Sequence, residues 1–121
     1  MIKNYSDLRI WQLSHELTLR IYKLTAAFPA DEKFGIVSQI RRSSSSIPAN
    51  IAEGFSRKST KEFVQFLYQA KGSLSETTYF LILSKDLKML EINIFTKLIE
   101  DYDVLGKQIN ALVKSLKGKI L

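Results

Sequence analysis

Apolar residues recur at every third or fourth position along most of this 121-residue sequence, which is the spacing of helices that bury one face. Stretches that alternate apolar and polar residues are too short to indicate a sheet. Capping and helix-breaking residues divide the pattern into four segments. The sequence therefore predicts an all-α protein, folded over residues 1–121 as a single antiparallel up-down-up-down four-helix bundle with short connections.

A proline separates the first two predicted helices. Ser6 is the expected N-cap of the first helix, which runs to about residue 27. Phe28-Pro29 ends it, because the residue before a proline is pushed out of the α region. Asp31 or Glu32 then opens the second helix by placing negative charge at its positive dipole end, and this helix runs to about residue 55.

The third and fourth predicted helices are separated by a break near residues 88 to 92. The capping box Ser59-Thr60-Lys61-Glu62 opens the third helix, which runs to about residue 86. Asn93 is the expected N-cap of the fourth helix, and Gly118 can end it. The apolar surface of the third helix widens late, so a second buried face and self-association are expected there. The residues that widen it are Tyr79, Phe80, Ile82 and Leu83.

The second helix carries a polar stripe beside its apolar stripe instead of opposite to it. The two stripes lie roughly 110° apart on a helical wheel. Polar groups next to a core need partners, so we predict that this stripe forms a structural or interface network. The network residues are Gln39, Arg42, Ser46, Asn50, Glu53 and, across on the third helix, Glu76.

Proline and glycine interrupt two of the predicted helices. Pro48 removes the hydrogen bond to the Ser44 carbonyl, so the second helix should be kinked at Pro48 or locally broken near residues 44 to 47. The hydroxyls of residues 43 to 46 can bond the freed backbone. Gly72-Ser73 costs the third helix about 1 kcal/mol in propensity, which suggests close approach of another backbone, most simply the serine run of the second helix.

Positive charge is concentrated in two regions of a chain whose net charge is +6. Between Lys33 and Lys61 four bases face one acid, so they either form ion pairs on a solvated face or contact phosphate. Arg41 is expected to point outward and Arg42 toward the interface network. The candidate nucleic-acid-binding residues are Arg41, Arg57, Lys58 and Lys61 around the second connection, and Lys107, Lys114 and Lys117 on the fourth helix.

The sequence does not indicate a catalytic residue, a metal site or a cofactor. It has no cysteine, and its one histidine, His15, cannot supply the paired Glu-x-x-His motifs of a di-metal bundle. The serine run has no oriented base for nucleophilic catalysis. Helix-core spacing favours packing over base stacking for three aromatic residues, Phe63, Phe66 and Phe80. There is no apolar targeting or membrane-spanning stretch, so no membrane partner and a cytoplasmic location are expected.

A set of motifs spread over nearly the whole chain resembles one protein family. The motifs are Trp11, Phe28-Pro29, Gln39-Ile40-Arg41-Arg42, Ser46-Ile47-Pro48-Ala49-Asn50-Ile51-Ala52-Glu53-Gly54, Arg57, Glu62-Phe63 and Gly72-Ser73-Leu74 with Glu76. They resemble those of the 23S ribosomal RNA intervening-sequence proteins. The resemblance implies a homopentameric barrel of four-helix protomers. It also places the chain near the accessory subunits of diversity-generating retroelements, which cooperate with a reverse transcriptase and nucleic acid.

Two functions are compatible with these patterns. In the first, the protein is a non-enzymatic, oligomeric helical module that binds RNA or DNA through its basic surface. In the alternative, it is a protein–protein interaction scaffold or accessory subunit with no direct nucleic-acid contact, and subunit contacts use the polar stripe. An enzymatic function is disfavoured by the missing ligands and bases. The dependence of nucleic-acid binding on salt would separate the first two hypotheses.

Overall fold

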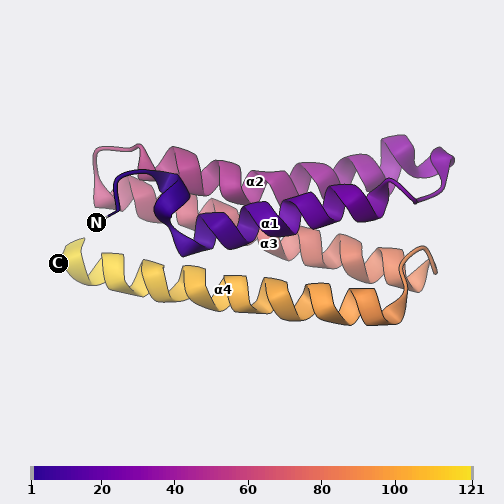
Figure 1. The fold of residues 1–121 in the computed structure, drawn as a ribbon. Coiled ribbons are helices and arrows are strands. Elements are labelled where there is room, and N and C mark those ends of the chain that lie inside the picture. Colours follow the sequence, from indigo (N-terminus) through magenta and orange to yellow (C-terminus); the bar gives the residue numbers. More distant parts are fainter. Residues whose placement is uncertain (1, 121) are drawn as a thin grey trace.

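A computed structural model describes residues 2–120, in which long helices pack side by side (Figure 1). Two 3-10 turns, Tyr5–Asp7 and Ala30–Glu32, and a π-helical turn, Lys33–Val37, precede the first and second long helices. No strand occurs within residues 2–120, in agreement with the predicted all-α class. The four α-helices of this region are α1 (Arg9–Thr25), α2 (Ser38–Phe55), α3 (Thr60–Asp86) and α4 (Ile92–Ile120).

Consecutive helices run in opposite directions in Figure 1. Helix α1 leads away from the end marked N, α2 returns to that end, α3 leads away again, and α4 returns. The connection between α2 and α3 and the C-terminal end of α4 therefore lie at the same end of the bundle. Side chains that are about 55 residues apart in the sequence are brought near each other by this arrangement.

The apolar stripes of all four helices meet in one core. Burial of these side chains is the main stabilising contribution to the fold. Phe63 and Phe80 pack against the core, as their spacing predicted, and Phe66 is half-buried. The fully buried apolar side chains include Leu17, Ile21, Ile40, Ile47, Ile51, Leu67, Leu81, Leu105 and Ile109.

Some helix ends lie where local capping places them. Ser59 Oγ accepts a hydrogen bond from the Glu62 N–H at 3.1 Å, which confirms the predicted start of α3. Helix α3 ends in a Schellman motif, with the Met89 N–H donating to the Ser84 carbonyl at 2.9 Å. Lys88 holds the left-handed position of this motif at φ 63°, which a glycine would occupy more easily.

The predicted boundaries at Ser6, Asn93 and Gly118 were wrong. Helix α1 begins at Arg9 because Asp7 Oδ2 accepts from the Asn4 N–H at 3.0 Å and holds Ser6 inside a 3-10 turn. Helix α4 begins at Ile92, so Asn93 is inside it, and it continues through Gly118 to Ile120. A glycine lowers helix propensity but does not by itself end a helix.

Helix α2 is continuous through Pro48, so the predicted local break near residues 44 to 47 is absent. A bend of the helix axis at Pro48 stays a prediction. The non-helical backbone occurs earlier, at Gly35, with φ −107° and ψ −111°. Glu32 precedes this turn, and its Oε1 accepts from the Ile36 N–H at 3.5 Å. The 3-10 turn and the π-helical turn therefore come before the regular part of α2, which begins at Ser38 and not at Asp31 or Glu32 as predicted.

Two helices approach closely at Gly54, and the approach predicted at Gly72 is absent. A Cβ atom placed on Gly54 would lie 2.6 Å from the Cβ of Phe66 and 3.0 Å from Cδ1 of Phe63. A Cβ atom on Gly72 would have no such neighbour within 4 Å in the protomer. Gly54 thus lets α2 contact α3, whereas Gly72 faces outward.

Candidate nucleic-acid interface

Arg41 is bound to the end of helix α1 and does not point freely outward as expected. Its Nε donates to Thr25 Oγ1 at 2.9 Å, and its Nη2 donates to the Tyr22 carbonyl at 3.1 Å. The guanidinium also lies 4.6 Å from the centroid of the Tyr22 ring. The last carbonyls of a helix lack intrahelical partners and attract positive charge, which explains this position. Arg41 is half-buried and is a poor candidate for phosphate contact.

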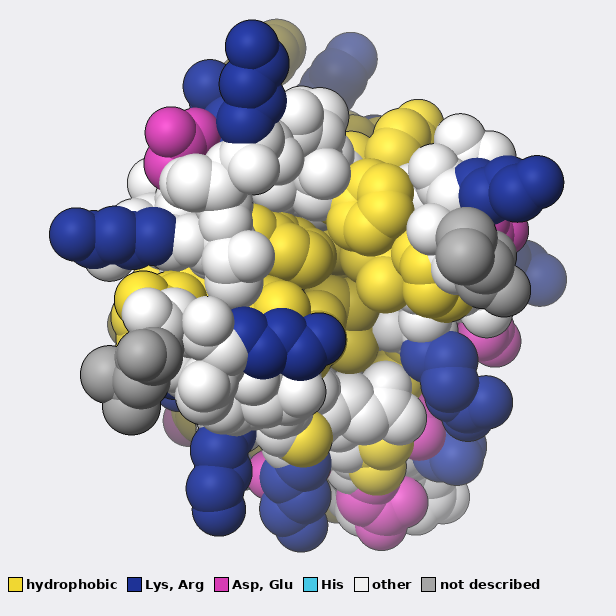
Figure 2. Space-filling model, turned by 90° about the vertical axis from the view of Figure 1, so that its left-hand side faces the viewer, with side chains coloured by type: hydrophobic (Ala, Val, Ile, Leu, Met, Phe, Trp, Pro, Cys, Tyr) yellow, Lys and Arg dark blue, Asp and Glu magenta, His cyan; other side chains and the backbone are white. Residues whose placement is uncertain are grey.

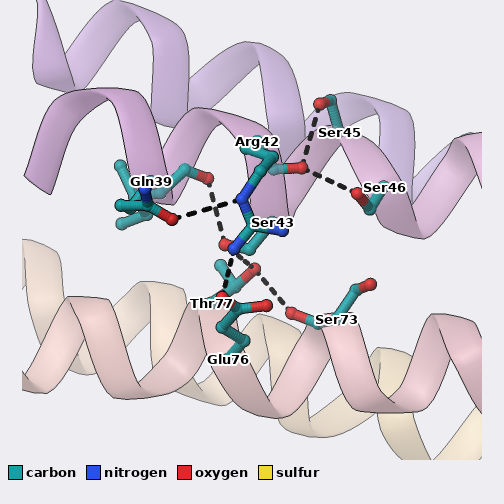
Figure 3. Close-up of polar contacts among 9 residues, drawn as sticks. Gln39, Arg42, Ser43, Ser45, Ser46, Ser73, Glu76 and Thr77 are labelled. Atoms are coloured by element: carbon teal, nitrogen blue, oxygen red, sulfur yellow. Dashed lines mark hydrogen bonds and ion pairs between the residues drawn. The ribbon is translucent and has the colours of Figure 1, made fainter. Parts of the chain in front are cut away.

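Arg42 takes a different path, toward helix α3 (Figure 3). It forms an ion pair with Glu76, and its Nε donates to Gln39 Oε1 at 3.2 Å. The Arg42 and Glu76 side chains are 51% and 40% exposed in the protomer. An ion pair this exposed contributes at most about 1 kcal/mol, so in the protomer alone it is a surface contact between α2 and α3.

The other residues of the predicted polar network form separate local contacts. Glu53 Oε1 accepts from Arg57 Nη2 at 2.7 Å, within the same helical stretch. Ser46 Oγ donates to the Arg42 carbonyl at 2.9 Å, and Asn50 Nδ2 donates to the Ser46 carbonyl at 2.8 Å. Glu53 and Asn50 thus do not join Arg42 and Glu76 in one side-chain network.

Buried hydroxyl groups connect α2 to α3. Thr77 Oγ1 lies 2.8 Å from Ser43 Oγ and 2.8 Å from the Ser73 carbonyl (Figure 3). Ser43 and Thr77 are both fully buried. Ser43 Oγ in turn donates to the Ile40 carbonyl at 3.3 Å. Each of these buried hydroxyls therefore has a hydrogen-bond partner, as burial of a polar group requires.

A hydroxyl from α1 reaches the carbonyl that Pro48 leaves free. Proline has no N–H to donate to the Ser44 carbonyl, and Thr18 Oγ1 lies 3.0 Å from that oxygen. The Thr18 hydroxyl also lies 2.8 Å from the Ser14 carbonyl, so it is shared between two acceptors. The serine hydroxyls that were expected to fill this role bond backward to the carbonyls of residues 40 to 42. A serine in a helix reaches only carbonyls three or four residues before it.

Four exposed lysines from different parts of the sequence meet at one end of the bundle. Lys58 and Lys61 follow α2 and begin α3, and Lys114 and Lys117 lie near the end of α4. We call the surface formed by these four exposed lysines the basic end. Figure 2 shows this end, with Lys and Arg side chains projecting around an apolar hollow. The fold therefore joins parts of the two basic regions that the sequence kept separate.

Two other candidate bases, Arg57 and Lys107, form ion pairs with acidic side chains that neutralise part of their positive potential. Arg57 pairs with Glu53, and its guanidinium lies 4.8 Å from the centroid of the Phe66 ring. Lys107 pairs with Asp103 at 3.1 Å. In the sequence, no acidic residue follows Asp103, so the part of α4 that approaches the basic end carries only basic charged residues.

Tyr68 on α3 lies beside the lysines of the basic end and was not predicted from the sequence. Its side chain is exposed, and its hydroxyl accepts from Lys117 Nζ at 3.3 Å. Lys71 Nζ lies 5.8 Å from the centroid of the same ring. The sequence could have indicated it, because Lys61 and Tyr68 are seven residues apart and therefore lie on the same face of a helix.

Farther along the bundle, an ion pair connects α1 to α4. Arg20 Nη1 lies 2.7 Å from Asp101 Oδ2, and Lys97 Nζ lies 3.2 Å from Asp101 Oδ1. Partial burial alone would raise the pKa of Asp101, but the hydrogen bonds from Arg20 and Lys97 outweigh it and hold the pKa below its ordinary value. The adjacent Tyr102 hydroxyl is buried without a protein partner, and burial raises its pKa.

The side chains with catalytic or metal-binding potential are scattered. His15 is exposed, and its ring stacks on Trp11 with centroids 4.8 Å apart. Within residues 2–120 no three metal-ligating side chains of the usual types come together. Among the helices that the structure describes, none is both long and apolar enough to cross a bilayer.

The antiparallel helices and their shared core define a helical-bundle protein, in which exposed lysines from separate parts of the sequence meet at one end. Its sequence matches the 23S rRNA-intervening sequence proteins over residues 6–111, and the protein belongs to that family. The match confirms the family that the motifs indicated, whereas the relation to retroelement accessory subunits stays a prediction.

A solved structure with the same fold comes from Bacteroides thetaiotaomicron and is described as a protein of unknown function from the S23 ribosomal protein family. The two chains superpose with a TM-score of 0.78 at 27% sequence identity. The alignment covers 87% of this chain and 98% of the other. No curated protein was found to match the sequence.

Proposed function

We propose that this protein is a non-enzymatic helical module that binds RNA or DNA through its basic end. The observation that supports the proposal is the meeting of exposed lysines from α3 and α4 at a place with few acids. Phosphate oxygens are the ligands that such unneutralised lysines attract most strongly. Contacts to phosphate carry no sequence information, so binding should be largely independent of base sequence. The lack of cysteine is compatible with the proposed cytoplasmic location.

Charge reversal at the basic end should abolish most of this binding. The double variant Lys114→Glu and Lys117→Glu should bind structured RNA and duplex DNA at least about tenfold more weakly, because two phosphate contacts become repulsive. Parent binding should also weaken steeply as salt rises. Fluorescence anisotropy at low and physiological salt measures both effects.

A matched control is available at the opposite end of the bundle. The double variant Lys23→Glu and Lys33→Glu makes the same change in net charge on two exposed lysines. It should retain most of the affinity, and both double variants should keep the parent's helical circular dichroism. If the parent binds neither nucleic acid at low salt, the proposal is wrong and an interaction scaffold becomes the better explanation.

We also propose that the protein self-associates, with a homopentamer as the expected assembly. Tyr79 and Ile82 on α3 remain 55% and 41% exposed, whereas Phe80 and Leu83 pack against the core. A separate apolar groove of about 450 Å³ lies between α1 and α2 and includes Leu19. When each copy uses one face to contact a different face of the next copy, the copies form a closed ring if the rotation between neighbours adds up to a full turn. A second copy that places its α3 face in this groove would cover both surfaces.

Light scattering tests the self-association. The parent should have several times the protomer mass of 13.9 kDa at micromolar concentration. Leu19→Glu should lower that mass, because it places a charge in the groove, while Leu87→Glu should not. Both leucines are more than half exposed, so neither change should unfold the protomer. A parent that remains monomeric would remove the proposal of self-association.

A further inference from the structure

We infer that Tyr68, with Lys71 and Lys117, forms a stacking site for an unpaired base, so that the protein prefers single-stranded nucleic acid to duplex. The inference rests on the proposed function, because it names the kind of nucleic acid that the basic end would bind. A base within a duplex is covered on both faces by its neighbours, whereas an unpaired base can stack on an aromatic side chain.

The geometry around Tyr68 has the two parts that such a site needs. The first is an aromatic ring at the surface, and the Tyr68 side chain is 39% exposed on α3. The second is positive charge within reach of the phosphates that flank the base. Lys117 Nζ lies 3.3 Å from the Tyr68 hydroxyl, and Lys71 Nζ lies 5.8 Å from the ring centroid. Lys71, from α3, places its ammonium over the ring, and Lys117, from α4, places its ammonium at the hydroxyl.

Two further lysines extend the positive surface in both directions. Lys61 precedes Tyr68 by two helical turns, about 10 Å along α3, and Lys114 precedes Lys117 by about one turn of α4. Both lysines are exposed. A single strand of nucleic acid that passes over Tyr68 would therefore meet Lys61 on one side of the ring and Lys114 on the other.

Acidic side chains are sparse in the two helical segments that carry this surface. On α3 the sequence has no acid between Glu62 and Glu76, and on α4 it has none after Asp103. Glu62 directly follows Lys61 but forms no ion pair with it, and Glu76 is already paired with Arg42. The lysines around Tyr68 are thus not neutralised by neighbours on their own helices, and the charge of the site is complementary to a phosphate backbone.

A merely structural role explains Tyr68 less well. The residue is not among the core side chains, and its hydroxyl bonds only to a flexible, exposed lysine, a contact of little energetic value. Tyr79 is the natural comparison. It is also an exposed tyrosine of α3, but its ring lies beside Phe80, with centroids 5.6 Å apart, instead of beside two lysines.

Anisotropy measurements with three tyrosine variants test the inference. The probes are an unstructured RNA of about 12 nucleotides, a length that spans one binding site of this type, and an RNA duplex of equal length. Tyr68→Leu should weaken single-strand binding about tenfold, since loss of one stacked base is typically worth that much, and should leave duplex binding nearly unchanged. Tyr68→Phe should bind like the parent because it keeps the ring. Tyr79→Leu should also bind like the parent when light scattering shows equal mass for the two proteins, because Tyr79 lies on the face proposed for self-association.

The outcomes separate this inference from the proposed function. If Tyr68→Leu binds the single strand as tightly as the parent does, no base stacks on Tyr68, although the basic end remains a nucleic-acid site. If Tyr68→Leu weakens single-strand and duplex binding equally, Tyr68 acts by positioning Lys117 through its hydroxyl and not by stacking on a base, and the preference for single strands is wrong. If the parent binds neither probe at low salt, the proposed function itself fails.

Discussion

Gly54→Ala should lower the free energy of unfolding by about 2 kcal/mol. The new Cβ would lie 2.6 Å from the Cβ of Phe66, and a Cβ atom moves only with its backbone. Overpacking of this kind costs about 1 to 3 kcal/mol, and the better helix propensity of alanine offsets up to about 1 kcal/mol of it. Urea unfolding followed by circular dichroism at one fixed protein concentration measures the change.

Gly72→Ala is the matched control, because it makes the same chemical change in the neighbouring helix. A Cβ at this position has no neighbour within 4 Å in the protomer. The variant should therefore be more stable than the parent by up to about 1 kcal/mol, through helix propensity alone. Equal effects of the two substitutions would show that the contact between Gly54 and Phe66 does not limit the packing of α2 on α3.

Thr18→Val should lower the free energy of unfolding by about 1 to 2 kcal/mol, although the two side chains have nearly the same shape. The substitution removes the hydroxyl that lies 3.0 Å from the Ser44 carbonyl. Thr18 and Ser44 are both buried, so water cannot easily replace the lost donor. A buried carbonyl without a partner costs about 1 to 3 kcal/mol. Thermal or urea unfolding of the variant measures the loss.

A double-mutant cycle with Pro48→Ala tests the reason for that loss. Alanine at position 48 restores an N–H that can donate to the Ser44 carbonyl within α2. Thr18→Val should then cost about 1 kcal/mol less in the Pro48→Ala background than in the parent. Additive effects would mean that the Ser44 carbonyl is not what Thr18 stabilises. The cycle is informative even if Pro48→Ala destabilises the protein by leaving a small cavity.

The features that sequence predicted well are those set within one helix. The buried isoleucines of α2 follow from periodicity, and the start of α3 at Ser59 follows from a local capping box. The expected cap at Ser6 was wrong because Asp7 offered the backbone an alternative, and Asn93 is not a cap because the Phe95 N–H already donates to the Glu91 carbonyl at 2.9 Å. Such competition changes a boundary by a few residues without changing which helices form.

The features that sequence missed depend on which helix faces meet. Arg41 could not be assigned to the end of α1 without knowing that this end lies beside α2. For the same reason, the Thr18 donor and the close contact of Gly54 with Phe66 were not found. The candidate site was predicted in part: its lysines were named, but their meeting at one end and the role of Tyr68 require the antiparallel arrangement.

The contacts at Thr18 and Gly54 together determine how far along its axis helix α2 can sit. A slide of α2 by one turn, about 5.4 Å, would separate the Ser44 carbonyl from its only donor on α1. The same slide would replace Gly54, opposite Phe66, with a residue that has a side chain. Apolar stripes alone tolerate such a shift, because one turn brings similar residues into similar places. A hydroxyl and a glycine therefore give this bundle a unique alignment that its apolar core would leave degenerate.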